Sequence, residues 1–221
     1  MTGIATPAKV VDLLRQAKAF VFDFDGTLVD SNPIKSKGFE RCFDDFPEQR
    51  DEILAYCRGS HHTPRSEKFR YVYKEILRLP YTAAVDAMLH ERYASVTTLQ
   101  IVQAPEIPAA GHFVRKASEA RMTAVLSSTP HDVLAEIFRR RGWTALFRLI
   151  RGAPVTKGPW LRDFRKQHCF RGDETVFFGD TSEDYRASLD AGCKFVAVGK
   201  NDWEAGIPHV RDFACLASAL D

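Results

Sequence analysis

The sequence predicts an α/β protein: a doubly wound, Rossmann-like core with a parallel sheet, and an inserted α-helical domain. Short apolar runs alternate with helical patterns in residues 1–31 and again in residues 106–221, as expected when helices join parallel strands. Between them, residues 32–105 lack β-branched runs and show helical periodicity. With 221 residues, 45% of them hydrophobic, the chain is long enough for one substantial core and a smaller unit.

The first core strand is predicted at Ala19–Phe22. This segment is continuously apolar and favours strand, as expected for a strand buried on both faces. A helix over Pro7–Ala17, in which apolar residues recur among charged ones, leads into the strand. Gly26 marks a tight turn shortly afterwards, so Asp23 and Asp25 are expected at the carboxyl end of this strand.

Helical periodicity predicts four helices in the inserted segment, at Pro33–Phe46, Pro47–Cys57, Pro64–Leu79 and Thr82–Val96. The third of them carries an apolar stripe at three- and four-residue spacing, made of Phe69, Val72, Tyr73, Ile76 and Leu77. We expect that stripe to pack into the insertion's own core.

After the insertion, helices and strands alternate again. Helices are predicted at Pro108–Arg121, Pro130–Arg141, Gly158–His168 and Ser182–Ala191. Short apolar runs predict strands at Met122–Ser127, Phe147–Ile150, Thr175–Phe178 and Lys194–Val198. Gly142 and Gly192 are placed to end two of the helices. Strands that alternate with helices in this way indicate a parallel sheet.

Composition excludes several classes of protein. The 31 basic and 29 acidic residues give a net charge of +2, which is too balanced to indicate nucleic acid or an anionic membrane as the main partner. The five cysteines are scattered and form no Cys-x-x-Cys pair, which argues against a disulfide framework and a structural zinc site. We therefore expect a reducing compartment, the cytoplasm. Neither a signal peptide nor a membrane span is predicted.

Asp23 and Asp25 carry the clearest chemical implication. Side chains alternate along a strand, so carboxylates two residues apart start out facing the same way. They lie at the strand end where open parallel sheets usually bind ligands. Two adjacent acids repel each other unless protons or a cation offset their charge, and oxygen ligands of this kind suit Mg²⁺. The pair therefore predicts a magnesium site.

A resemblance to the haloacid dehalogenase superfamily rests first on Asp23-Phe24-Asp25-Gly26-Thr27, which matches the opening Asp-x-Asp-Gly-Thr of its phosphotransferase members. Its other motifs follow in order: Ser127 ends an apolar run, Lys157 comes next, and Gly179-Asp180-Thr181-Ser182-Glu183-Asp184 follows a further apolar run. One departure is that Lys157 is followed by Gly158-Pro159, whereas the superfamily's Lys commonly precedes Pro directly. The insertion resembles the helical cap domain of the subgroup that includes phosphoglycolate phosphatase and β-phosphoglucomutase. This resemblance spans nearly the whole chain.

The resemblance implies a role for each matched acid. Asp23 would be the nucleophile that forms an aspartyl phosphate. Asp25 would be the general acid and afterwards the general base. Mg²⁺ would be held by Asp23, Asp180 and the backbone carbonyl of Asp25. Asp184 and Thr27 are expected to contact these ligands, without binding the metal themselves, and to hold them in place.

Two further residues are expected to contact the phosphoryl group, Ser127 through its hydroxyl and Lys157 through its ammonium. The residues after Ser127, namely Ser128 and Thr129, are able to cap the following helix instead, and Ser127 is preferred because it ends the apolar run. The alternative for Lys157 is a surface lysine, and the alternative for Asp184 is an ordinary acid in the first turn of a helix.

Substrate contacts in the insertion are expected from His61, His62, Arg65, Lys68 and Lys35. The first four gather around a predicted helix N-terminus, which is a natural anion site. The alternative is a solvated loop with a charged first turn. Lys35 follows closely on the catalytic loop, and the alternative there is a surface lysine.

The predicted function is a cytoplasmic, Mg²⁺-dependent phosphatase for a small phosphorylated metabolite, with sugar phosphates among the candidates. A phosphomutase shares the core residues and remains an alternative. A phosphonatase would need a lysine in the cap, for which Lys35 and Lys68 are candidates. An inert binding protein on this scaffold should lack a key acid, whereas Asp23, Asp25 and Asp180 are all present. The inserted domain argues against a signalling receiver. The expected partner is the metabolite alone, without nucleic acid or membrane, and the protein is expected to be a monomer or homodimer.

Overall fold

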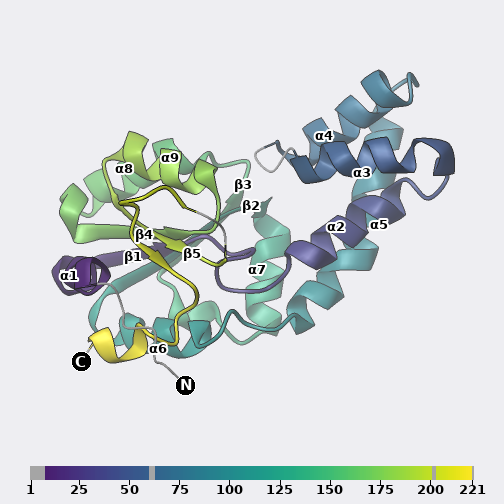
Figure 1. The fold of residues 1–221 in the computed structure, drawn as a ribbon. Coiled ribbons are helices and arrows are strands. Elements are labelled where there is room, and N and C mark those ends of the chain that lie inside the picture. The colour runs from purple at the N-terminus through teal and green to yellow at the C-terminus, as the bar shows by residue number, and fades with distance from the viewer. Residues whose placement is uncertain (1–7, 60–62, 201–202, 221) are drawn as a thin grey trace. The chain divides into compact units, whose positions relative to one another are not determined.

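The computed structural model describes residues 8–59, 63–200 and 203–220 (Figure 1). The chain forms two compact units. One consists of Met1–Asp30 and Ala104–Asp221, here called the core unit, and the other of Ser31–Gln103, here called the helical unit. Among the described residues, none of the helices combines the length and the apolar character that a membrane crossing requires.

The core unit is built on a six-stranded sheet with the strand order β3-β2-β1-β4-β5-β6. Every pair of neighbouring strands in it is parallel. The strands are β1 (Ala19–Phe22), β2 (Met122–Pro130), β3 (Leu149–Ala153), β4 (Thr175–Gly179), β5 (Lys194–Val198) and β6 (His209–Val210). The predicted doubly wound α/β fold is thereby confirmed. β1 lies in the middle, where Phe22 pairs with Val125 of β2 and Phe178 of β4.

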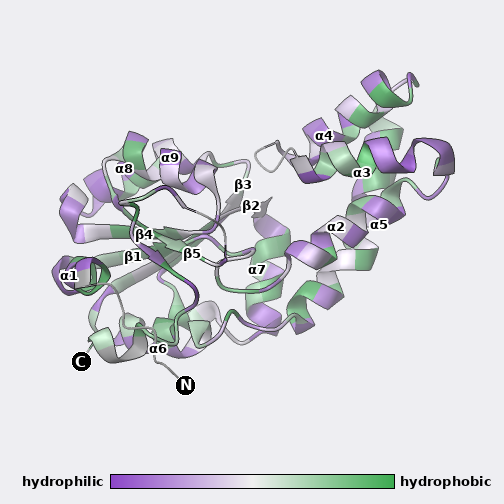
Figure 2. Cartoon of the chain, in the orientation of Figure 1, coloured by the Kyte–Doolittle hydropathy of each residue, from purple (hydrophilic) through white to green (hydrophobic). Residues whose placement is uncertain are grey.

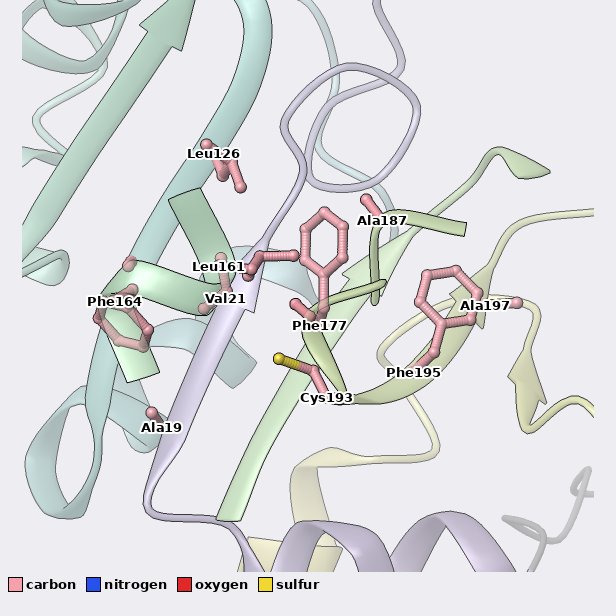
Figure 3. Close-up of a cluster of buried hydrophobic side chains, with 12 residues drawn as sticks. Ala19, Val21, Leu126, Leu161, Phe164, Phe177, Ala187, Cys193, Phe195 and Ala197 are labelled. Atoms are coloured by element: carbon pink, nitrogen blue, oxygen red, sulfur yellow. The ribbon is translucent and has the colours of Figure 1, made fainter. Parts of the chain in front are cut away.

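Helices cover both faces of this sheet, which explains why all four residues of β1 are buried. The core helices are α1 (Ala8–Gln16), α6 (Ala110–Ala120), α7 (His131–Arg140), α8 (Lys157–Gln167) and α9 (Ser182–Ala191). On one face, Leu161 and Phe164 of α8 and Ala187 of α9 pack with Val21 and Phe177 of the strands (Figure 3). In Figure 2 the strands are mainly hydrophobic, whereas these helices alternate between hydrophobic and hydrophilic residues.

Aromatic rings fill the other face of the sheet. Phe22 stacks on Phe178 at 4.9 Å between ring centroids, and Phe113 of α6 stacks on Phe20 at 5.8 Å. Phe213 lies 5.2 Å from Phe113 and is fully buried. The sequence prediction contained neither β6 nor this contribution from the C-terminal segment, because a two-residue strand is too short to show a period.

The helical unit contains α2 (Asn32–Cys42), α3 (Arg50–Gly59), α4 (Arg65–Tyr71) and α5 (Ala83–Gln103). α4 continues into a π-helical turn at Val72–Ile76. The predicted stripe packs as expected: Phe69, Val72 and Tyr73 are buried in the unit's own core, with Ile76 and Leu77 packed against it.

Several boundaries in the helical unit differ from the prediction, among them the ends of the first and last helices. The first helix ends at Cys42, where Phe46 was expected. The last extends beyond Val96 to Gln103. It continues through the β-branched Thr97, whose buried hydroxyl is satisfied within the helix because it donates to the carbonyl of Tyr93 at 2.8 Å.

The two chain segments that lead into and out of the helical unit are paired with each other inside the core unit. The backbone N–H of Asp30 donates to Pro105 at 3.0 Å, and that of Ile107 donates to Leu28 at 3.0 Å. Val29 and Glu106 form an antiparallel bridge between these bonds. The Glu106 side chain also accepts the backbone N–H of Gly111 at 2.9 Å, near the start of α6.

Candidate active site

Three buried carboxylates meet at the carboxyl ends of β1 and β4. Asp23 follows β1, and its backbone N–H donates to Phe178 of β4 at 2.8 Å. Asp180 follows β4, and Asp184 lies in the first turn of α9. Ligand oxygens from the three side chains lie within 4.8 Å of one another. Since β1 and β4 are adjacent and in register, the sheet itself brings these acids together.

Lys157 lies at the start of α8 and pairs with two of these acids. Its Nζ is 2.7 Å from Oδ1 of Asp23 and 2.6 Å from Oδ1 of Asp184. The Lys157 side chain is only 9% exposed, which excludes the surface-lysine alternative. Burial opposes its charge, but the contacts with Asp184 and Asp23 outweigh that effect and raise the pKa of Lys157 above its ordinary value. Lys157 is therefore an ammonium at neutral pH.

The surroundings of Asp23 disfavour its charged form, whereas those of Lys157 favour its charged form. Burial raises the pKa of Asp23 well above its usual value, the ion pair with Lys157 opposes that shift, and three neighbouring acids add to it. One lysine thus does not offset the negative charge gathered here. A further cation would lower the electrostatic free energy of the cluster.

Asp184 accepts hydrogen bonds on both of its carboxylate oxygens. Its Oδ1 accepts from Lys157, while its Oδ2 accepts the Thr181 hydroxyl at 2.5 Å and the Thr181 backbone N–H at 3.2 Å. The N–H of Asp184 in turn donates to the Thr181 hydroxyl, which completes a capping box at the start of α9. The fully buried Asp184 therefore fixes both the helix start and Lys157.

Gly179 is the residue whose lack of a side chain makes room for Asp184. A Cβ on Gly179 would lie 2.4 Å from Cβ of Asp184. We expect Gly179→Ala to push Asp184 away from Lys157, to destabilise the fold by about 1–3 kcal/mol and to lower activity. Thermal unfolding would measure this, with Gly59→Ala as the control, because a Cβ there meets no atom within 4 Å. An unchanged melting temperature for Gly179→Ala would show that α9 shifts freely.

Asp25 is held by hydroxyl groups from β2. Its Oδ2 accepts the Thr129 hydroxyl at 2.8 Å and the Ser127 hydroxyl at 3.4 Å, and all three side chains are buried. The Thr27 hydroxyl donates to Oδ1 of Asp180, a member of the acid cluster, at 3.4 Å. The predicted core residues therefore lie in three hydrogen-bonded groups: Asp25 with Ser127, Thr27 with Asp180, and Lys157 with Asp23 and Asp184.

Sequence reasoning gave three residues of this site no chemical role. Gly179 and Thr181 were quoted only as parts of the acidic motif, and Thr129 was considered only as a helix cap. Alternation along a strand was the signal that could have found Thr129, because Ser127 and Thr129 are two residues apart, as are Asp23 and Asp25. Pro130, which suggested a helix start, drew attention to capping instead.

The substrate contacts predicted in the helical unit are placed as follows. His61 and His62 lie outside the described residues. Lys68 is buried; its Nζ donates to the Cys57 carbonyl at 2.8 Å and lies 5.0 Å from the centre of the Phe39 ring. Arg65 lies 3.9 Å over the Tyr93 ring, and Lys35 is half-buried on α2. Lys68 and Arg65 thus have packing contacts within their own unit, and the role of all five residues in substrate binding remains a prediction.

The acid cluster fits a hard divalent cation. Carboxylate oxygens suit Mg²⁺, and ligands on opposite sides of an ion held at about 2.1 Å stand about 4.2 Å apart. The observed spread of up to 4.8 Å is close to that value. Since both oxygens of Asp184 already accept hydrogen bonds, Asp23 and Asp180 are the better ligands.

Comparisons with known proteins agree with this geometry. A family described as haloacid dehalogenase-like hydrolase matches residues 20–198. No curated protein sequence matches the chain significantly. A predicted phosphoglycolate phosphatase from Haemophilus somnus 129PT has a similar structure, with a TM-score of 0.71 at 17% identity over 93% of this chain and 99% of that one.

Two other solved structures are similar. CbbY from Rhodobacter sphaeroides, as a variant in complex with xylulose-(1,5)bisphosphate, has a TM-score of 0.70 at 18% identity over 93% of this chain and 99% of its own. A predicted phosphatase from Clostridium acetobutylicum has a TM-score of 0.69 at 17% identity over 91% and 97%, respectively. At such identities the similarity shows the fold.

Proposed function

Because the chain belongs to the haloacid dehalogenase-like hydrolase family, we propose that it is a Mg²⁺-dependent phosphatase that hydrolyses a small phosphorylated metabolite. The observation that carries this proposal is the buried set of Asp23, Asp180 and Asp184 around Lys157. Maintaining so much negative charge in the interior is unfavourable unless a cation binds there, and a bound cation would in turn attract an anionic substrate.

Asp23 is the proposed nucleophile. One of its carboxylate oxygens attacks phosphorus in line with the leaving oxygen, giving an aspartyl phosphate that water then hydrolyses. Lys157 holds Oδ1 of Asp23 and thereby fixes the orientation of the carboxylate. The same ammonium attracts the phosphoryl oxygens, whose charge it partly neutralises.

Asp25 is the proposed general acid and base. It gives a proton to the oxygen of the leaving alcohol as the P–O bond breaks, and afterwards takes one from the attacking water. Ser127, close to Asp25, donates its hydroxyl to a phosphoryl oxygen. A bound Mg²⁺, held by Asp23, Asp180 and the backbone carbonyl of Asp25, would offset the repulsion between the nucleophile and the phosphate.

The wider setting follows from the same proposal. The proposed partner is a small phosphorylated metabolite, and the proposed cap domain consists of residues 32–105. The proposed substrate contacts of this domain are His61, His62, Arg65, Lys68 and Lys35. The dispersed cysteines favour a reducing compartment, the cytoplasm. The protein works as a monomer or homodimer.

We expect metal-dependent phosphate release from at least one member of a panel of sugar phosphates, phosphoglycolate and nucleotides. A chelator should abolish the release and added Mg²⁺ should restore it, because Asp23 and Asp180 need a cation beside the incoming anion. Colorimetric phosphate determination measures the effect. Isomerised sugar phosphate formed without stoichiometric phosphate would identify a phosphomutase instead, and release that persists in chelator would contradict the role of the metal.

A further inference from the structure

Two hydroxyl groups converge on one oxygen of Asp25. The Thr129 hydroxyl donates to Oδ2 at 2.8 Å, and the Ser127 hydroxyl donates to the same atom at 3.4 Å. Thr129 is 3% exposed and Asp25 8% exposed, so water competes little for this contact. The shorter distance makes Thr129 the stronger of the two donors.

Thr129 does not occupy the N-cap position of the helix that follows it. The N-cap position of α7 is Pro130, and α7 has no side-chain cap hydrogen bond. β2 instead continues to Pro130, with a shift of register against β3 between Leu126 and Pro130. Within this part of the strand Ser127 and Thr129 are buried and Ser128 is exposed, so the two buried hydroxyls face the same way, toward Asp25.

The two hydroxyls differ in the acceptors that they can serve during a reaction. Ser127 Oγ accepts the backbone N–H of Thr129 at 3.1 Å, so its single proton is available for one acceptor. That proton cannot serve Asp25 and a phosphoryl oxygen at the same time. When Ser127 turns to the phosphate, Thr129 still holds Oδ2 of Asp25.

We propose that Thr129 is the positioning residue for the general acid, an inference that rests on the phosphatase function proposed above. Donation by Thr129 keeps Oδ2 of Asp25 an acceptor, so the proton of the neutral acid resides on Oδ1. As Asp23 bonds to phosphorus, the bond from phosphorus to the leaving oxygen breaks and that oxygen keeps the electron pair. It then takes the Oδ1 proton, and the resulting carboxylate still accepts from Thr129.

The test compares two leaving groups in the Mg²⁺-loaded enzyme. p-Nitrophenolate leaves without help from an acid, whereas an alkoxide needs a proton. kcat/KM reports only the steps up to aspartyl phosphate formation, so it isolates the step in which Asp25 is the acid. We expect Thr129→Val to lower kcat/KM about 10- to 100-fold on the best alkyl phosphate of the panel and less than about threefold on p-nitrophenyl phosphate.

Two variants serve as controls. Thr129→Ser keeps the hydroxyl and should restore the alkyl phosphate rate to within about threefold of the parent. Ser128→Ala removes an exposed hydroxyl one residue away and should change neither rate. An equal loss by Thr129→Val on both esters, no loss on either, or failure of Thr129→Ser to restore the rate would overturn the positioning role alone. A parent that hydrolyses neither ester would overturn the phosphatase function, and the role of Thr129 with it.

Discussion

Asp23→Asn is expected to reduce turnover at least about 10⁴-fold, because it removes the atom that attacks phosphorus while keeping the shape of the side chain. The fold should survive this change. Burial and the neighbouring acids raise the pKa of Asp23, so ionised Asp23 is an unfavourable charge in the metal-free protein. Replacing it with a neutral amide should leave the melting temperature without Mg²⁺ unchanged or higher.

Steady-state phosphate release and thermal unfolding, measured on the same samples, would check both parts of this expectation. Asp163→Asn is the matched control, because Asp163 is an exposed acid on α8. Rapid-quench mass spectrometry should show a phosphoryl adduct on the parent and none on Asp23→Asn. A correctly folded Asp23→Asn that turns over within about tenfold of the parent would exclude Asp23 as the nucleophile.

Lys157→Met is expected to have the largest effect on stability. Removing the ammonium leaves Asp23 and Asp184 facing each other in the interior without their shared partner. Loss of one partner from a buried ion pair destabilises a protein by about 3–5 kcal/mol, which corresponds to a fall in melting temperature of roughly 6–20 °C at this chain length. Activity should fall as well, because Asp23 loses its orientation.

Differential scanning fluorimetry with and without Mg²⁺ would test this prediction. Added Mg²⁺ should recover part of the lost stability in Lys157→Met, since a cation then again offsets the acids. Lys166→Ala, at an exposed position on the same helix, should behave like the parent. A melting temperature for Lys157→Met equal to that of the parent would mean that the two carboxylates find other partners.

The core could be predicted from the sequence because its strands are buried on both faces. Such strands appear as continuous apolar runs, and the acids Asp23 and Asp180 directly follow two of them. Adjacent parallel strands then bring those acids together without further assumptions. Lys157 was placed by its motif, although Gly158 stands where Pro is common; the structure shows Gly158 buried beside Asp190 of α9, where a Cβ would make only ordinary contact.

The parts that sequence reasoning missed depend on contacts between segments that are distant in the chain. Thr129 is defined by Asp25, which lies 104 positions away. Phe213 contributes to the core although its neighbour β6 has only two residues. The burial of Lys68 follows from its contact with Cys57 on another helix. No local period encodes such contacts, because they are decided by tertiary packing.

The pairing of Asp30 with Pro105 and of Leu28 with Ile107 has a consequence for chain entropy and for modularity. The two ends of the Ser31–Gln103 segment leave the core unit side by side, because the residues that flank the segment are hydrogen-bonded to each other. Topologically the whole helical unit is then the loop of a short hairpin, and the entropy of closing a loop grows only as the logarithm of its length. We therefore expect that insertions of very different size at this point would change the stability of the core unit itself only slightly.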